Sequence, residues 1–213
     1  MRAQASTASG VVADSRPTAE APALGPPLRI IAGDKKRMRL VAPLGLAVRP
    51  TTDFVRGAAM SQLGGFFNGG RVLDLCAGTG SVALEFLSRG CAEAVAVETD
   101  SEALTLLRQN AAHTKLADRL RIVAIDVELA VALLGKERAQ FAYVWFDPPW
   151  HFSRYVEVLQ AIAANNLLQV GGEVLVESRE PLAAEQLAPV WRVVVSRRYG
   201  AGWLSRWTLG AAG

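Results

Sequence analysis

The chain has 213 residues, of which 51% are hydrophobic and 20% are charged, so it can bury one substantial core. The formal net charge of +3 permits an anionic partner without demanding one. No apolar run reaches the roughly 18 residues that cross a bilayer, and two cysteines are too few for a disulfide framework or a zinc site. We therefore expect a cytoplasmic protein in a reducing environment, with no membrane segment and no bound metal.

The first 27 residues have the composition of a disordered tail, because Ala, Ser, Thr and Pro dominate and no continuous apolar segment is present. The remainder, residues 28–213, suits a single domain. We divide it into a basic β-hairpin over 28–48, a helix and linker over 49–70, and a core over 71–209.

The hairpin is predicted from two short strands, Leu28–Gly33 and Arg39–Val41, with a turn that begins at Gly33-Asp34. The cations between and beside the strands suit contacts with phosphate groups, and each such contact would weaken binding as salt rises. A solvated loop explains the same charges. The candidate phosphate-binding residues are Lys35, Lys36, Arg37 and Arg39.

A helix is predicted from Phe54 to about Leu63, because Arg49-Pro50-Thr51-Thr52-Asp53 places a proline and cap-forming residues before it. The glycine-rich stretch 64–70 ends it.

Apolar strands and helical segments alternate over the core, which predicts the α/β class with a mostly parallel sheet and helices on both faces. Only Tyr199-Gly200-Ala201-Gly202 separates the last two strands, so we expect them to form an antiparallel hairpin at one side of the sheet. The expected strands are Arg71–Cys76, Ala94–Glu98, Leu120–Asp126, Phe141–Phe146, Glu173–Glu177, Trp191–Arg198 and Trp203–Leu209. The expected helices are Ser81–Arg89, Ser101–His113, Val127–Leu134 and Arg154–Leu168.

A glycine turn follows the first core strand, in the stretch Asp74-Leu75-Cys76-Ala77-Gly78-Thr79-Gly80-Ser81. Its glycines allow a tight turn and leave no side chain between the backbone and a ligand. Residues 78–83 also fit the G-x-G-x-x-[GA] dinucleotide fingerprint, and their place between a strand and a helix strengthens the match. The turn predicts a nucleotide-like ligand.

Acidic side chains follow the next three strands. In open α/β sheets, ligands bind beyond the carboxyl ends of the strands. Glu98 stands where a carboxylate takes the hydroxyls of a ribose, and Asp126 where an acceptor would meet the amino group of an adenine. Each alone is consistent with a solvated charge, but their joint placement with Asp147 and the glycine turn favours a site.

Asp147-Pro148-Pro149-Trp150 follows the buried strand Phe141–Phe146 and contains the parts needed to hold a planar amine. The prolines have no N–H to donate, so the carbonyls of the turn can be aimed at a ligand. Asp147 can accept a hydrogen bond from an exocyclic NH₂ group, and Trp150 can stack on its ring. The alternative is a plain Pro-Pro turn beside a core tryptophan.

In this order, the motifs resemble those of class I S-adenosylmethionine-dependent methyltransferases, whose members that act on amino nitrogens carry a [DN]-P-P-[FYW] turn. More narrowly, the chain resembles the bacterial 16S ribosomal RNA (guanine-966-N2)-methyltransferases from about Leu28 to Leu209. The motifs that carry the resemblance are Arg49-Pro50-Thr51-Thr52-Asp53-x-Val55-Arg56, Asp74-x-x-Ala77-Gly78-Thr79-Gly80, Asp147-Pro148-Pro149 and Val176-Glu177-Ser178.

The resemblance implies a seven-stranded Rossmann-like sheet whose last strand is antiparallel, and S-adenosylmethionine as cofactor. It further implies that the target guanine is held by the 147–150 turn, that the basic hairpin holds RNA, and that the partner is 16S ribosomal RNA, within the 30S subunit or an assembly intermediate. A monomer is expected. The implied cofactor-binding residues are Thr52, Arg56, Asp74, Ala77, Gly78, Gly80, Glu98 and Asp126, and the implied catalytic residues are Asp147, Pro148, Pro149 and Trp150.

Three alternatives remain open. An NAD(P) oxidoreductase would use the same glycine turn and Glu98 but has no need for the 147–150 turn. An N-methyltransferase of another target, adenine N6 in nucleic acid or a protein glutamine, would keep the fold and the cofactor. An RNA-binding module built on an inactive methyltransferase fold is disfavoured, because the expected strand-end residues are all present.

Overall fold

The computed structural model describes residues 28–42 and 52–210. The predicted tail and the Arg49-Pro50-Thr51 part of the family motif lie outside these residues.

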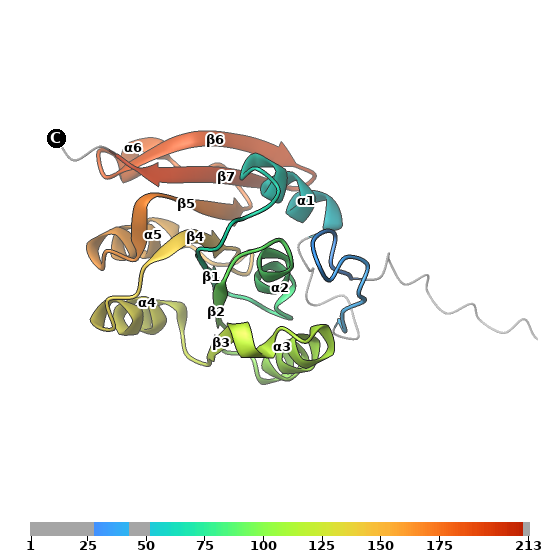
Figure 1. Ribbon diagram of the computed structural model, residues 1–213. Helices are drawn as coiled ribbons and strands as arrows, with labels where there is room; N and C mark the ends of the chain where they lie inside the picture. The colour runs from blue at the N-terminus through green and yellow to red at the C-terminus, as the bar shows by residue number, and fades with distance from the viewer. Residues whose placement is uncertain (1–27, 43–51, 211–213) are drawn as a thin grey trace, which may run out of the picture.

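The core is one seven-stranded sheet in the order β3-β2-β1-β4-β5-β7-β6 (Figure 1). β7 pairs antiparallel with both of its neighbours, and the remaining pairings are parallel, so the predicted α/β class and its antiparallel last strand are confirmed. The strands are β1 (Arg71–Leu75), β2 (Glu93–Val97), β3 (Leu120–Val123), β4 (Phe141–Phe146), β5 (Leu168–Ser178), β6 (Trp191–Tyr199) and β7 (Gly202–Leu209).

Helices cover both faces of the sheet, and each face has its own hydrophobic core. One core joins the sheet to α1, α2, α3 and the segment 28–42, which we call the N-terminal segment. The other joins it to α4, α5 and α6. Strands covered on both sides become continuous apolar runs, which is why β1 and β4 could be recognised from the sequence. The helices are α1 (Asp53–Gln62), α2 (Ser81–Ser88), α3 (Ser101–Thr114), α4 (Val127–Lys136), α5 (Tyr155–Ala164) and α6 (Ala184–Leu187), with a 3₁₀ turn at Ala117–Arg119.

Two predicted core elements are shorter in the structure by three residues or more. The predicted strand Leu120–Asp126 ends at Val123, because Asp126 instead caps α4 by accepting the Glu128 N–H at 2.9 Å. The predicted helix Arg154–Leu168 ends at Ala164, since Asn166 adopts a left-handed φ of 53° and the chain then enters β5.

The N-terminal segment forms a looser hairpin than predicted. Its arms share one antiparallel bridge, Arg29 with Arg39, and backbone hydrogen bonds that include Leu40 N–H to Leu28 O at 2.8 Å. The chain therefore turns back on itself there without forming extended strands.

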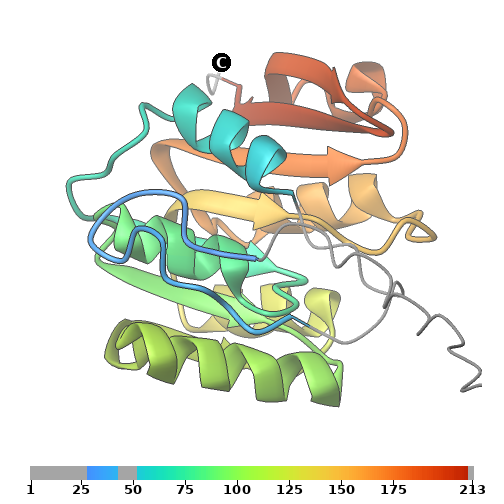
Figure 2. The same cartoon turned by 90° about the vertical axis from the view of Figure 1, so that its right-hand side faces the viewer.

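In Figure 2 the arrowheads of β4 and β5 point to the right, so the carboxyl edge of the parallel strands lies on that side of the molecule. Within residues 28–42 and 52–210, no helix is long and apolar enough to cross a membrane.

Candidate active site at the carboxyl edge of the sheet

The glycine turn after β1 is built from left-handed backbone. Cys76, Gly78 and Gly80 have φ angles of 63°, 53° and 79°. The Ala77 N–H donates to Val97 O at 2.8 Å, and the Gly80 N–H donates to Ala77 O at 2.8 Å, which ties the turn to β2 and closes it. A Cβ placed on Gly78 would meet nothing within 4 Å, so the space above this residue is open to a ligand.

Asp74 lies behind the glycine turn, fully buried in β1. One carboxylate oxygen accepts the Ala83 N–H at 2.9 Å and so fixes the start of α2, while the other has no hydrogen-bond partner among the residues described. Burial raises the pKa of Asp74 well above its usual range, and repulsion from Asp147 and Glu98 adds to the shift. Asp74 therefore supports the turn from beneath, and its direct contact with a cofactor stays a prediction.

Glu98 links the end of β2 to the glycine turn. One of its carboxylate oxygens accepts the Gly78 N–H at 2.7 Å, and the other accepts the N–H groups of Thr99 and Asp100 at 2.7 and 2.9 Å. These three bonds fix the orientation of the carboxylate at the strand end, where the sequence predicts a ribose-binding group.

A negative field covers this end of the sheet. Burial raises the pKa of the Cys76 thiol, and Glu98, Asp74, Asp147 and Asp126 each raise it further. Side chains from four different strand ends thus act on one thiol, which means that the fold gathers the acidic residues that the sequence predicts to lie together. Such a field favours a ligand with positive charge. Among the described residues, no group of His, Cys, Asp and Glu is arranged to hold a metal ion.

The 147–150 turn follows β4, which lies between β1 and β5 in the sheet. Asp147 is half-buried, Pro148 is buried, and the side chain of Trp150 is 42% exposed. The carbonyl of Pro149 accepts the Phe152 N–H at 2.8 Å. Within the described part of the chain the Pro148 carbonyl accepts no hydrogen bond, so it is available to a donor on a ligand.

Tyr155 lies at the site but was not predicted from the sequence. It is the first residue on the apolar face of a helix, and such a position indicates a residue of the hydrophobic core. Its ring packs edge-on against Phe152, with the centroids 5.4 Å apart, and against Phe146. Its hydroxyl is buried and has no hydrogen-bond partner within residues 28–42 and 52–210. Burial raises the pKa of Tyr155 to about 12, and Asp147 is the largest of the charges that add to this shift.

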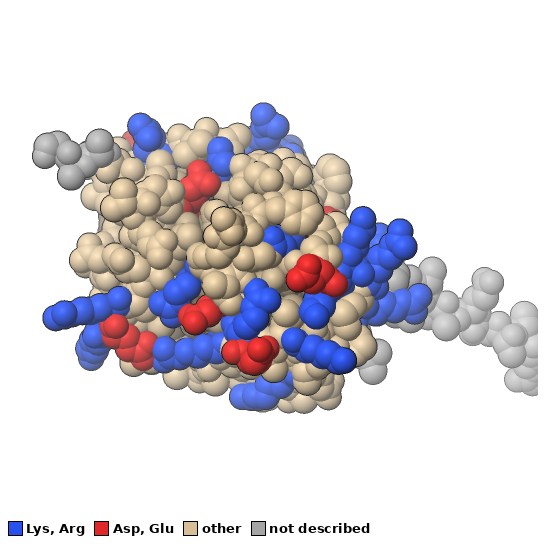
Figure 3. Space-filling view, viewed as in Figure 1, with Lys and Arg blue, Asp and Glu red and all other residues tan. Residues whose placement is uncertain are grey.

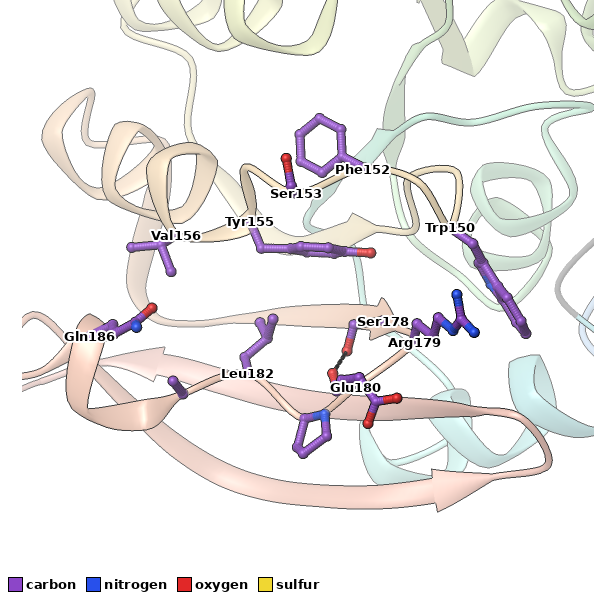
Figure 4. Close-up of a pocket in the computed structure, with 12 residues that line it drawn as sticks. Trp150, Phe152, Ser153, Tyr155, Val156, Ser178, Arg179, Glu180, Leu182 and Gln186 are labelled. Atoms are coloured by element: carbon purple, nitrogen blue, oxygen red, sulfur yellow. Dashed lines mark hydrogen bonds between the residues drawn. The ribbon is translucent and has the colours of Figure 1, made fainter.

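A cavity of about 340 Å³ lies beside Tyr155, between the loop that follows Trp150 and the loop that follows β5 (Figure 4). Figure 4 shows the Tyr155 hydroxyl and the Arg179 guanidinium pointing toward the end of the cavity at which Trp150 stands. The loop after β5 follows the Val176-Glu177-Ser178 motif directly and carries no motif of its own, so nothing in the sequence predicts this cavity.

Thr52 and Arg56, expected to help close the cofactor pocket, have structural contacts in the described residues. Thr52 caps α1 by accepting the Val55 N–H at 3.3 Å. The Arg56 side chain is fully buried, and it donates to Arg29 O at 2.6 Å and to Asp53 at 2.9 Å. Their cofactor role stays a prediction, and for Arg56 these contacts place the charge between α1 and the N-terminal segment.

The tip of the N-terminal segment, which carries Lys35, Lys36 and Arg37, is not brought to the carboxyl edge. Arg39 lies nearer to it, because the Val41 N–H donates to Asn110 Oδ1 at 2.7 Å and Asn110 Nδ2 donates to Thr79 O of the glycine turn at 3.0 Å. The tip of the segment packs on the last turn of α2, where the Asp34 N–H donates to Ser88 O at 2.9 Å and the Lys35 N–H to Ser88 Oγ at 2.9 Å. The glycine turn lies at the opposite end of that eight-residue helix, about 12 Å away at 1.5 Å per residue. Figure 3 shows Lys and Arg side chains gathered over this segment. Lys36, Arg37 and Arg39 are exposed, whereas Lys35 is half-buried.

Comparisons with known proteins agree with this geometry. A family model described as "Conserved hypothetical protein 95" matches residues 28–208. The protein named Ribosomal RNA small subunit methyltransferase D from Escherichia coli K12 is 31% identical over 151 residues, which cover 71% of this chain and 74% of that protein. Its namesake from Haemophilus influenzae is 27% identical over 153 residues, covering 72% of this chain and 79% of that protein. The solved structure of a hypothetical protein from Thermus thermophilus is 30% identical with a TM-score of 0.71, covering 84% of this chain and 97% of that one.

Proposed function

Because the chain belongs to the family described as "Conserved hypothetical protein 95", we propose that its site methylates the exocyclic N2 of a guanine in 16S ribosomal RNA. The protein is a methyltransferase with the class I fold and S-adenosylmethionine as methyl donor, as its motifs predict. Because the chain belongs to a family whose named relatives are methyltransferases, the glycine turn and Glu98 no longer favour an NAD(P) oxidoreductase. Adenine N6 and protein glutamine remain as competing targets.

The residues at the ends of β1 and β2 fit the methyl donor. Open space above Gly78 admits a part of the cofactor that lies close to the backbone, and Glu98 is oriented to accept from a ribose diol. The negative field around Cys76 complements the positive charge of a sulfonium and of an ammonium group. Asp126, at the start of α4, is our candidate for the adenine edge.

The 147–150 turn would hold the guanine. S-adenosylmethionine supplies an electrophilic methyl group attached to sulfur. For transfer, the N2 lone pair would form the new N–C bond while the S–C bond breaks with both electrons left on sulfur, and the surplus N2 proton would pass to Asp147 or to solvent water. Asp147 and the Pro148 carbonyl would accept hydrogen bonds from the amine, aim its lone pair at the methyl group, and bind more strongly as positive charge develops on nitrogen.

The observation that carries the proposal is the position of this turn. It stands at the end of β4, beside the glycine turn of β1. There the Pro148 carbonyl, which accepts no hydrogen bond from the described residues, follows directly on the half-buried Asp147 carboxylate. Trp150, a residue that is 42% exposed, would replace part of the stacking that a guanine loses on leaving an RNA stack.

Incubation with radiolabelled S-adenosylmethionine tests the proposal. The substrates are 30S subunits and naked 16S ribosomal RNA, and the labelled product is digested to nucleosides and separated. We expect N2-methylguanosine. Label in N6-methyladenosine, or in protein instead of RNA, would assign the site to one of the other targets.

A further inference from the structure

The cavity beside Trp150 lies on one side of β4, and the groups that fit the cofactor lie on the other. The sheet order places β1, β2 and β3 on one flank of β4 and β5 on the opposite flank. The cavity opens between the loop after β4 and the loop after β5. It is therefore separate from the cofactor side, and Trp150 is the part of the 147–150 turn that lines it.

The lining suits a flat, partly apolar ring with an anionic neighbour. Trp150, Phe152 and Leu182 supply apolar and aromatic surface, and a volume of about 340 Å³ is within the usual range for a small-ligand pocket. Arg179 is exposed and makes no ion pair within residues 28–42 and 52–210, so its charge is available to a phosphate. Glu180, on the same loop, offers an acceptor to a base amino group.

A second observation points to a ligand at this place. Tyr155 lines the cavity, its side chain is about nine-tenths buried, and its hydroxyl has no hydrogen-bond partner in the part of the chain that the structure describes. Leaving a buried hydroxyl unpaired costs about 1–3 kcal/mol, which a ligand group could recover by a small movement of the loop.

We propose that this cavity binds the nucleobase next to the target guanine in the RNA strand, with Arg179 contacting the phosphate that joins the two nucleotides. The inference rests on the proposed function, because it needs an RNA substrate whose target base is held by the 147–150 turn. A target base that leaves its stack also uncovers its neighbour, which the apolar and aromatic lining of the cavity can then receive.

The test is a double-mutant cycle that combines protein variants in which the cavity is filled with RNA substrates that lack one base. Ala183→Phe fills the cavity from the loop before α6, and Val156→Phe fills it independently from α5 on the opposite wall. Ala164→Phe, at an exposed position outside the cavity, is the matched control. Fluorescence anisotropy gives the Kd of each protein for an oligoribonucleotide with a central guanine, and for versions with an abasic site immediately before or after it.

We expect wild-type protein to lose about tenfold in affinity when one of the two neighbouring bases is absent, as stacking energies suggest. Both filled variants should bind intact RNA about tenfold more weakly and show no additional weakening on abasic RNA, whereas the control should behave as wild type. Equal weakening on abasic RNA in wild-type and filled proteins, or none in wild type, overturns the proposal. Binding results of this kind are independent of the product analysis, so a failure of guanine methylation is recognised separately.

Discussion

The two flanks of β4 differ in how their polar groups are satisfied. On the side of β1 to β3, the cofactor flank of our proposal, Glu98 accepts three backbone N–H groups, and Asp74 and Asp126 each cap the start of a helix. On the side of β5, the RNA flank of our proposal, the Tyr155 hydroxyl lacks a partner and Arg179 makes no ion pair among the described residues. Apart from one Asp74 oxygen that has no partner among the described residues, the cofactor flank is therefore organised before any ligand arrives, whereas the RNA flank keeps groups that only a substrate would complete. We therefore expect substitutions on the two flanks to affect different steps, cofactor binding on one and RNA binding on the other.

Replacement of Asp147 should have the largest effect. We expect Asp147→Ala to lower kcat by roughly 100- to 1000-fold, the usual reduction when one preorganised group that stabilises developing charge is removed. Cofactor affinity, measured by calorimetry, should stay within a fewfold of wild type, because Asp147 serves the base. Near-normal turnover would refute the assigned role.

Removal of the Glu98 carboxylate should affect the cofactor flank alone. A hydrogen bond to a charged group contributes about 1.5–3 kcal/mol, so Glu98→Ala should weaken S-adenosylmethionine binding by roughly 10- to 100-fold. RNA affinity should not change. Glu102→Ala, an exposed carboxylate on the first turn of α3, is the control. Equal weakening of cofactor and RNA binding would show that the flanks are not independent.

Neutralising the tip of the N-terminal segment should affect RNA binding by charge alone. In the variant with Lys35, Lys36 and Arg37 changed to Gln, the slope of log Kd against log salt should become shallower by up to about 0.7 for each phosphate that the protein no longer neutralises. The Lys136→Gln, Arg138→Gln pair neutralises exposed cations elsewhere. An unchanged slope would show that the tip does not contact RNA phosphates. This outcome is a real alternative, because the tip lies far from the glycine turn.

Tyr155→Phe should have the smallest effect, and a favourable one. Removing a buried hydroxyl that has no partner among the described residues should leave the free energy of unfolding unchanged or raise it by about 1 kcal/mol. The pKa of Tyr155 is raised to about 12 in the folded state, above the ordinary tyrosine pKa of 10.0. Below pH 10 the phenol is neutral in both states, and as the pH rises from 10 toward 12 its ionisation in the unfolded state lowers the free energy of unfolding. Wild-type stability should therefore fall more steeply than that of the variant over this range, as thermal unfolding measures. Parallel curves would contradict the raised pKa.

Much of the cofactor flank could be predicted, because its signals are local. A glycine turn after an apolar run and an acid at a strand end are read directly, and the sheet rule then brings Glu98 and Asp147 to one edge. Arg56 could not be placed, since its burial depends on α1, α2 and the N-terminal segment meeting in space. Tyr155 and Arg179 were missed for a related reason: their significance comes from two loops that are neighbours only because β4 pairs with β5.

Glu85 shows that the N-terminal segment belongs to the folded body of the enzyme. This carboxylate in α2 is fully buried and accepts the Ile31 and Ala32 N–H groups at 2.7 and 3.0 Å, while Arg89 reaches it at 2.6 Å and Arg56 at 3.6 Å. Shortening the protein to its Rossmann-like core would strip both amide donors from a buried charge. A minimal version of this methyltransferase must therefore retain Ile31 and Ala32, although both residues precede the first helix.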